Sequence, residues 1–283
     1  MSLSINSNMA ATRASQYLAA NHQNLQKSLD RLSSGKRITN PSDDAGGLAV
    51  SMKMEHSING LKGVANNISN AISLLQVQDG AMSTVADIIT RIGELQGMYS
   101  DVTKNSDDKD TYDTELTELK AQITAITGTT GTLFNGVNVF GGTYDPSDAT
   151  VGLEVSLDTS GSSKLEIKDT DIAADTNLLV LMGATKNSFG GATALTAAEI
   201  ADALEEVAGH RAENGGQAKR LEYALADVEN QITNLTAANG RIMDVDIATE
   251  SAALARHQIL VQASAAMVAQ ANSANNVALQ LLQ

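Results

Sequence analysis

Two segments of the chain, residues 61–96 and 200–242, carry apolar residues at the same alternating spacing of four and three. The repeating positions are Leu61, Ala65, Ile68, Ile72, Leu75, Met82, Ala86 and Ile89 in the first segment, and Ile200, Leu204, Val207, Leu221, Leu225, Val228, Ile232, Leu235 and Ile242 in the second. An apolar repeat of about 3.5 residues keeps one stripe of a helix facing a partner helix. The sequence therefore predicts a mainly α protein in which long antiparallel helices form a coiled-coil-like rod.

The two ends of the chain also have helical patterns, but almost no charge. Arg13 is the only charged side chain before Lys27, and none follows Arg256. The expected seams are Leu18, His22, Leu25, Leu29 and Leu32 at one end, and Leu260, Ala263, Met267, Ala274, Val277 and Leu281 at the other. A helix exposed to water usually has a charged outer face, and one apolar stripe does not recover the entropy lost when such an end becomes ordered. We expect the ends to be disordered in the monomer and to fold on assembly; the alternative is that both dock inside a monomeric bundle.

Breaks between the helices follow from turn chemistry. Residues 34–43 interrupt the first helix, because Gly35 accepts positive φ and Pro41 disfavours helix just before it. Ser42 or Asp43 is expected to cap the second helix, which should run to about Tyr99. A third helix shows the same spacing at Tyr112, Leu116, Leu119, Ile123 and Ile126.

A change of period marks the middle of the chain. Asn135-Gly136 indicates a tight turn. Val151, Leu153, Val155 and Leu157 alternate with other residues, as do Leu165 and Ile167 after a turn at 158–163, which predicts a small β-hairpin. The Gly-, Ala- and Thr-rich residues that follow are expected to form a loop or small cap.

The composition argues against several classes of function. The chain has 19 Lys and Arg against 33 Asp and Glu, a net charge of −14, which disfavours nucleic acid and anionic membranes as partners. It has no Cys, no paired histidines at metal-ligand spacing, no phosphate-binding glycine loop and no GxSxG. No apolar run is long enough to span a bilayer. We expect no enzymatic activity, cofactor or metal.

Three longer motifs resemble those of bacterial flagellin. They are RLSSGKRITNPSDDAGGLAV at 31–50, TLFNGVNVFGG at 132–142, and GRIMDVDIATESAALARHQILVQASAAMVAQAN at 240–272. The resemblance covers about residues 1–142 and 197–283. It implies inner-tube helices at 1–43 and 244–283, a helical rod at 44–142 and 197–243, and a hairpin with a short outer region at 143–196.

The resemblance also implies function and partners. The chain would polymerise with copies of itself into the extracellular flagellar filament used for motility. It would meet the flagellar export apparatus, a chaperone, and the cap and junction proteins, and leave the cell without a cleaved signal peptide. The joint between inner tube and rod is expected at Arg31, Leu32, Ser33, Ser34, Gly35, Asn40, Asp43, Asp44, Arg241, Ile242, Asp244, Asp246 and Glu250.

A further family motif, which binds a Toll-like receptor of innate immunity, resembles residues 90–98. Arg91, Glu94 and Leu95 match it, whereas Gly93 stands where many relatives have a second Arg. Two alternatives to a filament subunit remain open at this point. One is a hook–filament junction protein of the same architecture, and the other is a monomeric secreted ligand of host receptors.

Overall fold

The computed structural model describes residues 8–128, 131–140, 153–158, 161–167, 172, 176–183, 186–191 and 194–280. The elements in chain order are α1 (Met9–Ser34), α2 (Ala45–Tyr99), α3 (Ser106–Thr127), β1 (Leu133–Phe134), β2 (Val137–Asn138), β3 (Leu153–Ser156), β4 (Lys164–Ile167), α4 (Thr176–Met182), α5 (Ala197–Met243) and α6 (Ile247–Gln280). The mainly α fold with a small β-hairpin region is confirmed. Helix packing divides it into two compact units: unit 1 (Met1–Ile58 with Thr233–Gln283) and unit 2 (Asn59–Ile232).

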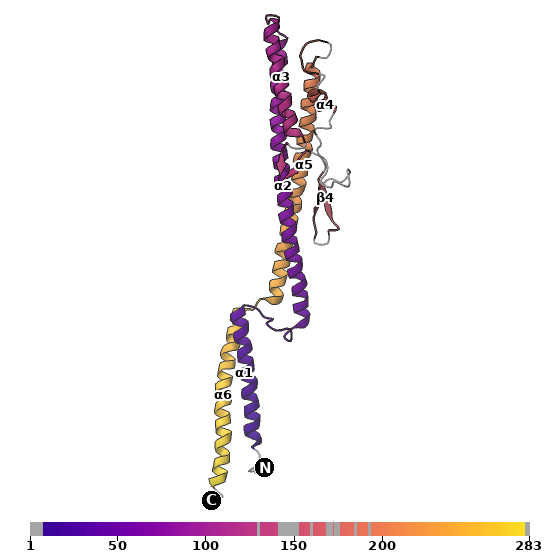
Figure 1. Cartoon of the computed structure of the whole chain (residues 1–283). Helices are drawn as coiled ribbons and strands as arrows, with labels where there is room; N and C mark the ends of the chain where they lie inside the picture. Colours follow the sequence, from indigo (N-terminus) through magenta and orange to yellow (C-terminus); the bar gives the residue numbers. More distant parts are fainter. Residues whose placement is uncertain are drawn as a thin grey trace. The chain divides into compact units, whose positions relative to one another are not determined.

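In unit 1, α1 and α6 lie side by side along their length (Figure 1). The Asn8 Nδ2 donates to the Ala271 carbonyl at 2.9 Å, and the Asn21 Nδ2 donates to the Ser264 Oγ at 2.7 Å. Because partner numbers fall on α6 as they rise on α1, the two helices are antiparallel. Asn8 also caps α1, since its Oδ1 accepts from the Ala11 N–H.

The face on which α1 and α6 meet differs in part from the predicted seams. The less exposed residues are Ala11, Ala14, Leu18, Asn21, Leu25, Ser28 and Leu32 on α1, and Leu254, His257, Val261, Ser264, Val268 and Ala271 on α6. Five residues expected in the seams are exposed: His22, Leu29, Leu260, Ala263 and Met267. The side chains at 274 and 277 and residue 281 lie outside the described part. Leucines and valines thus face the partner helix together with small and polar residues, while Leu29, Leu260 and Met267 point away from it.

Unit 2 contains the main apolar core. The Arg211 side chain of α5 bonds to Asp79 of α2, and Ile200 lies against Gly93, so α2 and α5 are antiparallel. Helix α3 packs along α2 and closes the core (Figure 1). The fully buried large side chains of this core include Met82, Ile89, Ile92, Leu95, Leu116, Ile123, Phe140, Ile172, Leu178 and Leu181. The apolar spacing predicted for the rod is therefore the spacing that fills this core.

The middle of the chain confirms the turn and the hairpin. Asn135 and Gly136 have φ of 51° and 81° between β1 and β2, which suits a tight hairpin turn. Strands β3 and β4 are antiparallel, with Val155 opposite Leu165, while Val151 lies outside the described residues. Helix α4 was not predicted. It forms because Leu178 and Leu181, three residues apart, are both buried in the core.

Candidate assembly joint

Two chain segments meet where α1 and α5 end, and they hold each other by backbone hydrogen bonds. Gly35 ends α1 in the left-handed conformation, with φ of 69°. Lys36 and Asp244 then form an isolated antiparallel bridge. The Arg37 N–H donates to the Met243 carbonyl at 2.6 Å, and the Val245 N–H donates to the Gly35 carbonyl at 3.0 Å. We call residues 35–37 and 243–245 the joint bridge.

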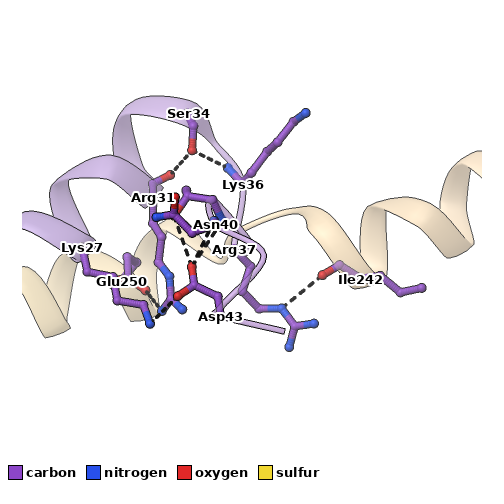
Figure 2. Close-up of polar contacts among 10 residues, drawn as sticks. Lys27, Arg31, Ser34, Lys36, Arg37, Asn40, Asp43, Ile242 and Glu250 are labelled. Carbon is purple, nitrogen blue, oxygen red and sulfur yellow. Dashed lines mark hydrogen bonds and ion pairs between the residues drawn. The ribbon is translucent and has the colours of Figure 1, made fainter. Parts of the chain in front are cut away.

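Two arginines, Arg31 and Arg37, make polar contacts next to the joint bridge (Figure 2). The Arg37 Nε donates to the Ile242 carbonyl at 3.1 Å, and its guanidinium lies 3.9 Å from the Asp44 carboxylate. Arg31 of α1 lies 3.6 Å from the Glu250 carboxylate of α6, with both side chains largely buried. The Arg31 Nε is buried without an acceptor. Loss of Glu250 would therefore leave a largely buried guanidinium unpaired, which is strongly unfavourable.

Asp43 ties the loop after α1 back to that helix (Figure 2). Its Oδ1 lies 2.7 Å from the Lys27 Nζ, and its Oδ2 accepts from the backbone N–H groups of Thr39 and Asn40. The hydrogen bond from Lys27, helped by those from the backbone, lowers the Asp43 pKa from 3.8 to about 2. Asp43 therefore stabilises the loop in its ionised form.

The predicted cap of α2 is wrong by one residue. Asp44, rather than Ser42 or Asp43, caps the helix, since its Oδ1 accepts from the Gly47 N–H at 2.8 Å. The reason is that the Asp43 carboxylate is already bound to Lys27 and to the loop backbone. Gly47 has no space for a side chain: an added Cβ would lie 2.4 Å from the Asp44 Oδ2 and 3.1 Å from the Ile38 Cδ1. Ile38 is itself buried.

Asp246 caps α6 in a similar way. Its Oδ1 accepts from the Ala248 and Thr249 N–H groups, and its Oδ2 accepts from the Thr249 hydroxyl at 2.5 Å. These bonds, that from the Thr249 hydroxyl first, lower the Asp246 pKa. An ionised carboxylate also suits the positive end of the helix dipole.

The structure brings together most of the residues expected at the joint. Those with contacts there are Arg31, Gly35, Asp43, Asp44, Ile242, Asp244, Asp246 and Glu250. The Ser34 hydroxyl accepts from the Lys36 N–H, Leu32 is partly buried, and Asn40 contributes its backbone. Ser33 and Arg241 are exposed. Sequence reasoning missed Lys27, Lys36 and Arg37, whose partners are a carboxylate of the loop and backbone groups at the end of α5 that no local pattern reveals.

The suggested receptor motif lies in unit 2. Arg91 pairs with Glu94 of its own helix and with Glu115 of α3, at 3.0 and 2.9 Å. These carboxylates, Glu94 first, raise the Arg91 pKa. Leu95 is fully buried in the core and does not reach the surface. Of the three residues, only Arg91 and Glu94 are exposed.

The end helices keep large apolar side chains in water. Tyr17, Ile259 and Met267 are 68%, 66% and 62% exposed, and Met9, Leu29, Ile247 and Leu260 are exposed as well. None of the described helices is long and apolar enough to cross a membrane. Large apolar side chains that gather on exposed helices mark contact surfaces for another protein. They define this chain as a subunit of a larger assembly.

The comparisons with known proteins identify that assembly. Residues 5–145 match the bacterial flagellin N-terminal helical region, and residues 197–282 match the bacterial flagellin C-terminal helical region. The chain is 33% identical to a flagellin of Bacillus subtilis, 35% to one of Halalkalibacterium halodurans, and 32% to a flagellar filament 33 kDa core protein of Treponema phagedenis. Each alignment covers 99% of both chains. A crystal structure of Bacillus cereus flagellin matches 62% of this chain and 94% of its own, with 29% identity and a TM-score of 0.48.

The chain belongs to the bacterial flagellin family. It is a structural subunit that polymerises with copies of itself into the extracellular flagellar filament.

Proposed function

We propose that this flagellin assembles by covering the outward apolar faces of α1 and α6 with the same helices of neighbouring subunits. The supporting observation is that the α1–α6 pair covers only one side of each helix and leaves Tyr17, Ile259 and Met267 in water. One chain does not bury those side chains. The ends are therefore expected to be disordered in the monomer and to fold when neighbours supply the missing burial.

The joint is proposed to hold α1 and α6 in one relative register while they enter the inner tube. The joint bridge and the Arg31–Glu250 pair connect the C-terminal end of α1 to the N-terminal end of α6. Residues 1–43 and 244–283 would form the inner tube, residues 44–142 and 197–243 the rod, and residues 143–196 the outer region. A change at the joint would alter how the paired end helices meet neighbouring subunits.

Seeded polymerisation tests both proposals. Purified protein is added to short filament seeds, and elongation is followed by electron microscopy. The parent chain is expected to elongate without limit, which separates a filament subunit from a junction protein that stops at a short ring. Arg31→Ala and Asp44→Ala are expected to give altered or failed filaments, whereas Lys53→Ala, an exposed change on α2, should behave like the parent. Parent-like filaments and normal swimming in both joint variants would reject the joint.

Export through the flagellar apparatus is the proposed route to the filament tip. The resemblance to flagellins supports passage as an unfolded chain with a chaperone, without a cleaved signal peptide, followed by contact with junction and cap proteins. Ends with almost no charge that fold only on assembly suit this route. Secretion should stop in a strain that lacks the flagellar export apparatus, and continued secretion would contradict the proposal.

Recognition by a Toll-like receptor is proposed for the exposed part of the motif in unit 2. Arg91 and Glu94 are accessible, but Arg91 is engaged by two carboxylates and Leu95 is buried. Binding would therefore depend on Arg91 and Glu94 without Leu95. Arg91→Ala should weaken receptor signalling relative to the parent, while Lys62→Ala, an exposed change on the same helix, should not. Equal signals from all three proteins would remove Arg91 from the interface.

A further inference from the structure

Within unit 2, the described seams of α2 and α5 each contain one buried polar residue at a position that is otherwise apolar. On α5 the buried residues spaced by seven are Ile200, Val207, Asn214, Leu221 and Val228. On α2 they are Val64, Ala71, Gln78, Val85 and Ile92. Asn214 and Gln78 are 2% and 4% exposed, so both lie as deep as their apolar neighbours.

These two polar residues occur at the same level of unit 2. The Asn214 Nδ2 donates to the Leu75 carbonyl at 2.9 Å, one turn from Gln78 on α2. The Gln78 Nε2 donates to the Val139 carbonyl, also at 2.9 Å. Beside them, Arg211 binds both carboxylate oxygens of Asp79, at 2.9 and 3.3 Å. We call Gln78, Asp79, Arg211 and Asn214 the polar level.

Asn214 lowers stability at its position. The Asn214 Oδ1 and the Gln217 Oε1 are both buried without a hydrogen-bond partner, and an unpaired buried acceptor is unfavourable. A leucine at position 214 would continue the apolar seam on both sides. In coiled coils, a single buried asparagine lowers stability but selects one register and one arrangement of the helices.

A slip of one heptad between α2 and α5 shows what the polar level excludes. Such a slip would bring Arg211 opposite Ala86 in one direction or Ile72 in the other, so its two-oxygen contact with Asp79 would be lost. Asn214 would move to the level of Met82 or Ile68, both fully buried among apolar residues. The apolar residues themselves, being repeated every seven positions, would meet equivalent apolar residues after the slip.

We propose that the polar level is the register lock of the rod: it fixes how α2 and α5 align, which the repeating apolar seam alone leaves ambiguous. A filament needs subunits of identical length and surface. If α2 and α5 slipped by one heptad, the contact residues of one helix would be displaced by seven positions relative to those of the other. The lock therefore makes each subunit fit the same lattice.

Cysteine cross-linking in the full-length chain tests this lock, because the protein has no cysteine of its own. Gly93→Cys with Ile200→Cys reports the observed register, since a Cβ at Gly93 would lie 3.6 Å from the Ile200 Cγ2. Gly93→Cys with Val207→Cys reports a slip of one heptad. Both pairs are placed in the parent, in Asn214→Leu, and in Val228→Leu, a matched change in the same apolar series.

In the parent and in Val228→Leu, the first pair should oxidise and the slipped pair should stay below about one tenth of that yield. In Asn214→Leu the slipped yield should rise about fivefold or more, without a lower melting temperature. Arg211→Met, a change at the more exposed edge of the polar level, should also raise the yield of the slipped cross-link. This variant provides the test if Asn214→Leu does not fold. A slipped yield that stays at the parent level in both variants, while the first pair still forms, would overturn the register lock.

Discussion

Two neighbouring glycines at the start of α2 should respond to the same substitution with opposite signs. A methyl group at Gly47 would lie 2.4 Å from the Asp44 Oδ2 and 3.1 Å from the Ile38 Cδ1, whereas one at Gly46 would meet only the Asp44 Oδ1, at an ordinary 3.6 Å. Gly47→Ala must therefore displace the carboxylate that caps α2 and shift a buried isoleucine. Gly46→Ala needs no movement.

The size of the difference follows from these contacts. Replacing a helical glycine by alanine gains up to about 1 kcal/mol. At Gly47 this gain is outweighed by the lost cap, about 1 kcal/mol, and by overpacking against Ile38, about 1–3 kcal/mol. Gly47→Ala should thus destabilise by about 1–3 kcal/mol, while Gly46→Ala should be neutral or stabilise by up to about 1 kcal/mol.

Thermal dissociation of filaments, followed by far-UV circular dichroism at matched subunit concentration, measures the two variants. Gly47→Ala should dissociate several degrees below the parent, and Gly46→Ala at or above the parent temperature. Equal dissociation temperatures for the two variants would refute the packing of Asp44 and Ile38 on Gly47 that the joint requires.

Three further predictions concern buried charge, pH and salt. The Lys120 ammonium is buried and donates to the carbonyls of residues 183 and 186 and to the Asn187 side chain at 2.7–2.8 Å. Lys120→Met should therefore lower the free energy of unfolding of the monomer, measured in urea, by about 2 kcal/mol. The exposed Lys62→Met should change that free energy by less than about 0.5 kcal/mol. Because the Asp43 pKa is lowered to about 2, the stabilisation that this carboxylate gives the folded chain is complete above pH 3.8 and is lost as the pH falls toward 2. Filament dissociation should therefore depend less on pH between 3.8 and 2 in Asp43→Asn than in the parent. The same pH dependence in both proteins would contradict the Lys27 contact. Unit 2 has 11 Lys and Arg against 26 Asp and Glu, a net charge of −15. Salt screens the repulsion between subunits, so the critical concentration for assembly should fall as ionic strength rises. A critical concentration that rises with salt would contradict this role of charge repulsion.

The long helices could be predicted because their signals are local and repeated. Leu61, Ile68, Leu75, Met82 and Ile89 recur every seven residues, and all are buried in the structure. The end of α2 at Tyr99 and the turn at Asn135-Gly136 also follow from residues nearby in the sequence. Local propensity and tertiary packing agree at these places.

The contacts of the joint could not be predicted, because they join residues far apart in the chain. The Arg37 Nε donates to a backbone carbonyl 205 residues away, and a carbonyl leaves no signature in a side-chain pattern. The capping role of Asp44 depended on the capture of Asp43 by Lys27, a tertiary contact. The packed face of α1 and α6 was partly misassigned, since spacing alone does not distinguish a seam toward the partner helix from an apolar face toward other subunits.

Amide hydrogen exchange on dilute monomer and on assembled filament tests the central claim most directly. The claim is that α1 and α6 gain their stability from neighbouring subunits, because the α1–α6 pair leaves bulky apolar side chains such as Tyr17, Ile259 and Met267 exposed. Residues 9–34 and 247–280 should exchange almost without protection in the monomer and slowly in the filament. Strong protection of both segments in the monomer, or none gained in the filament, would contradict the account.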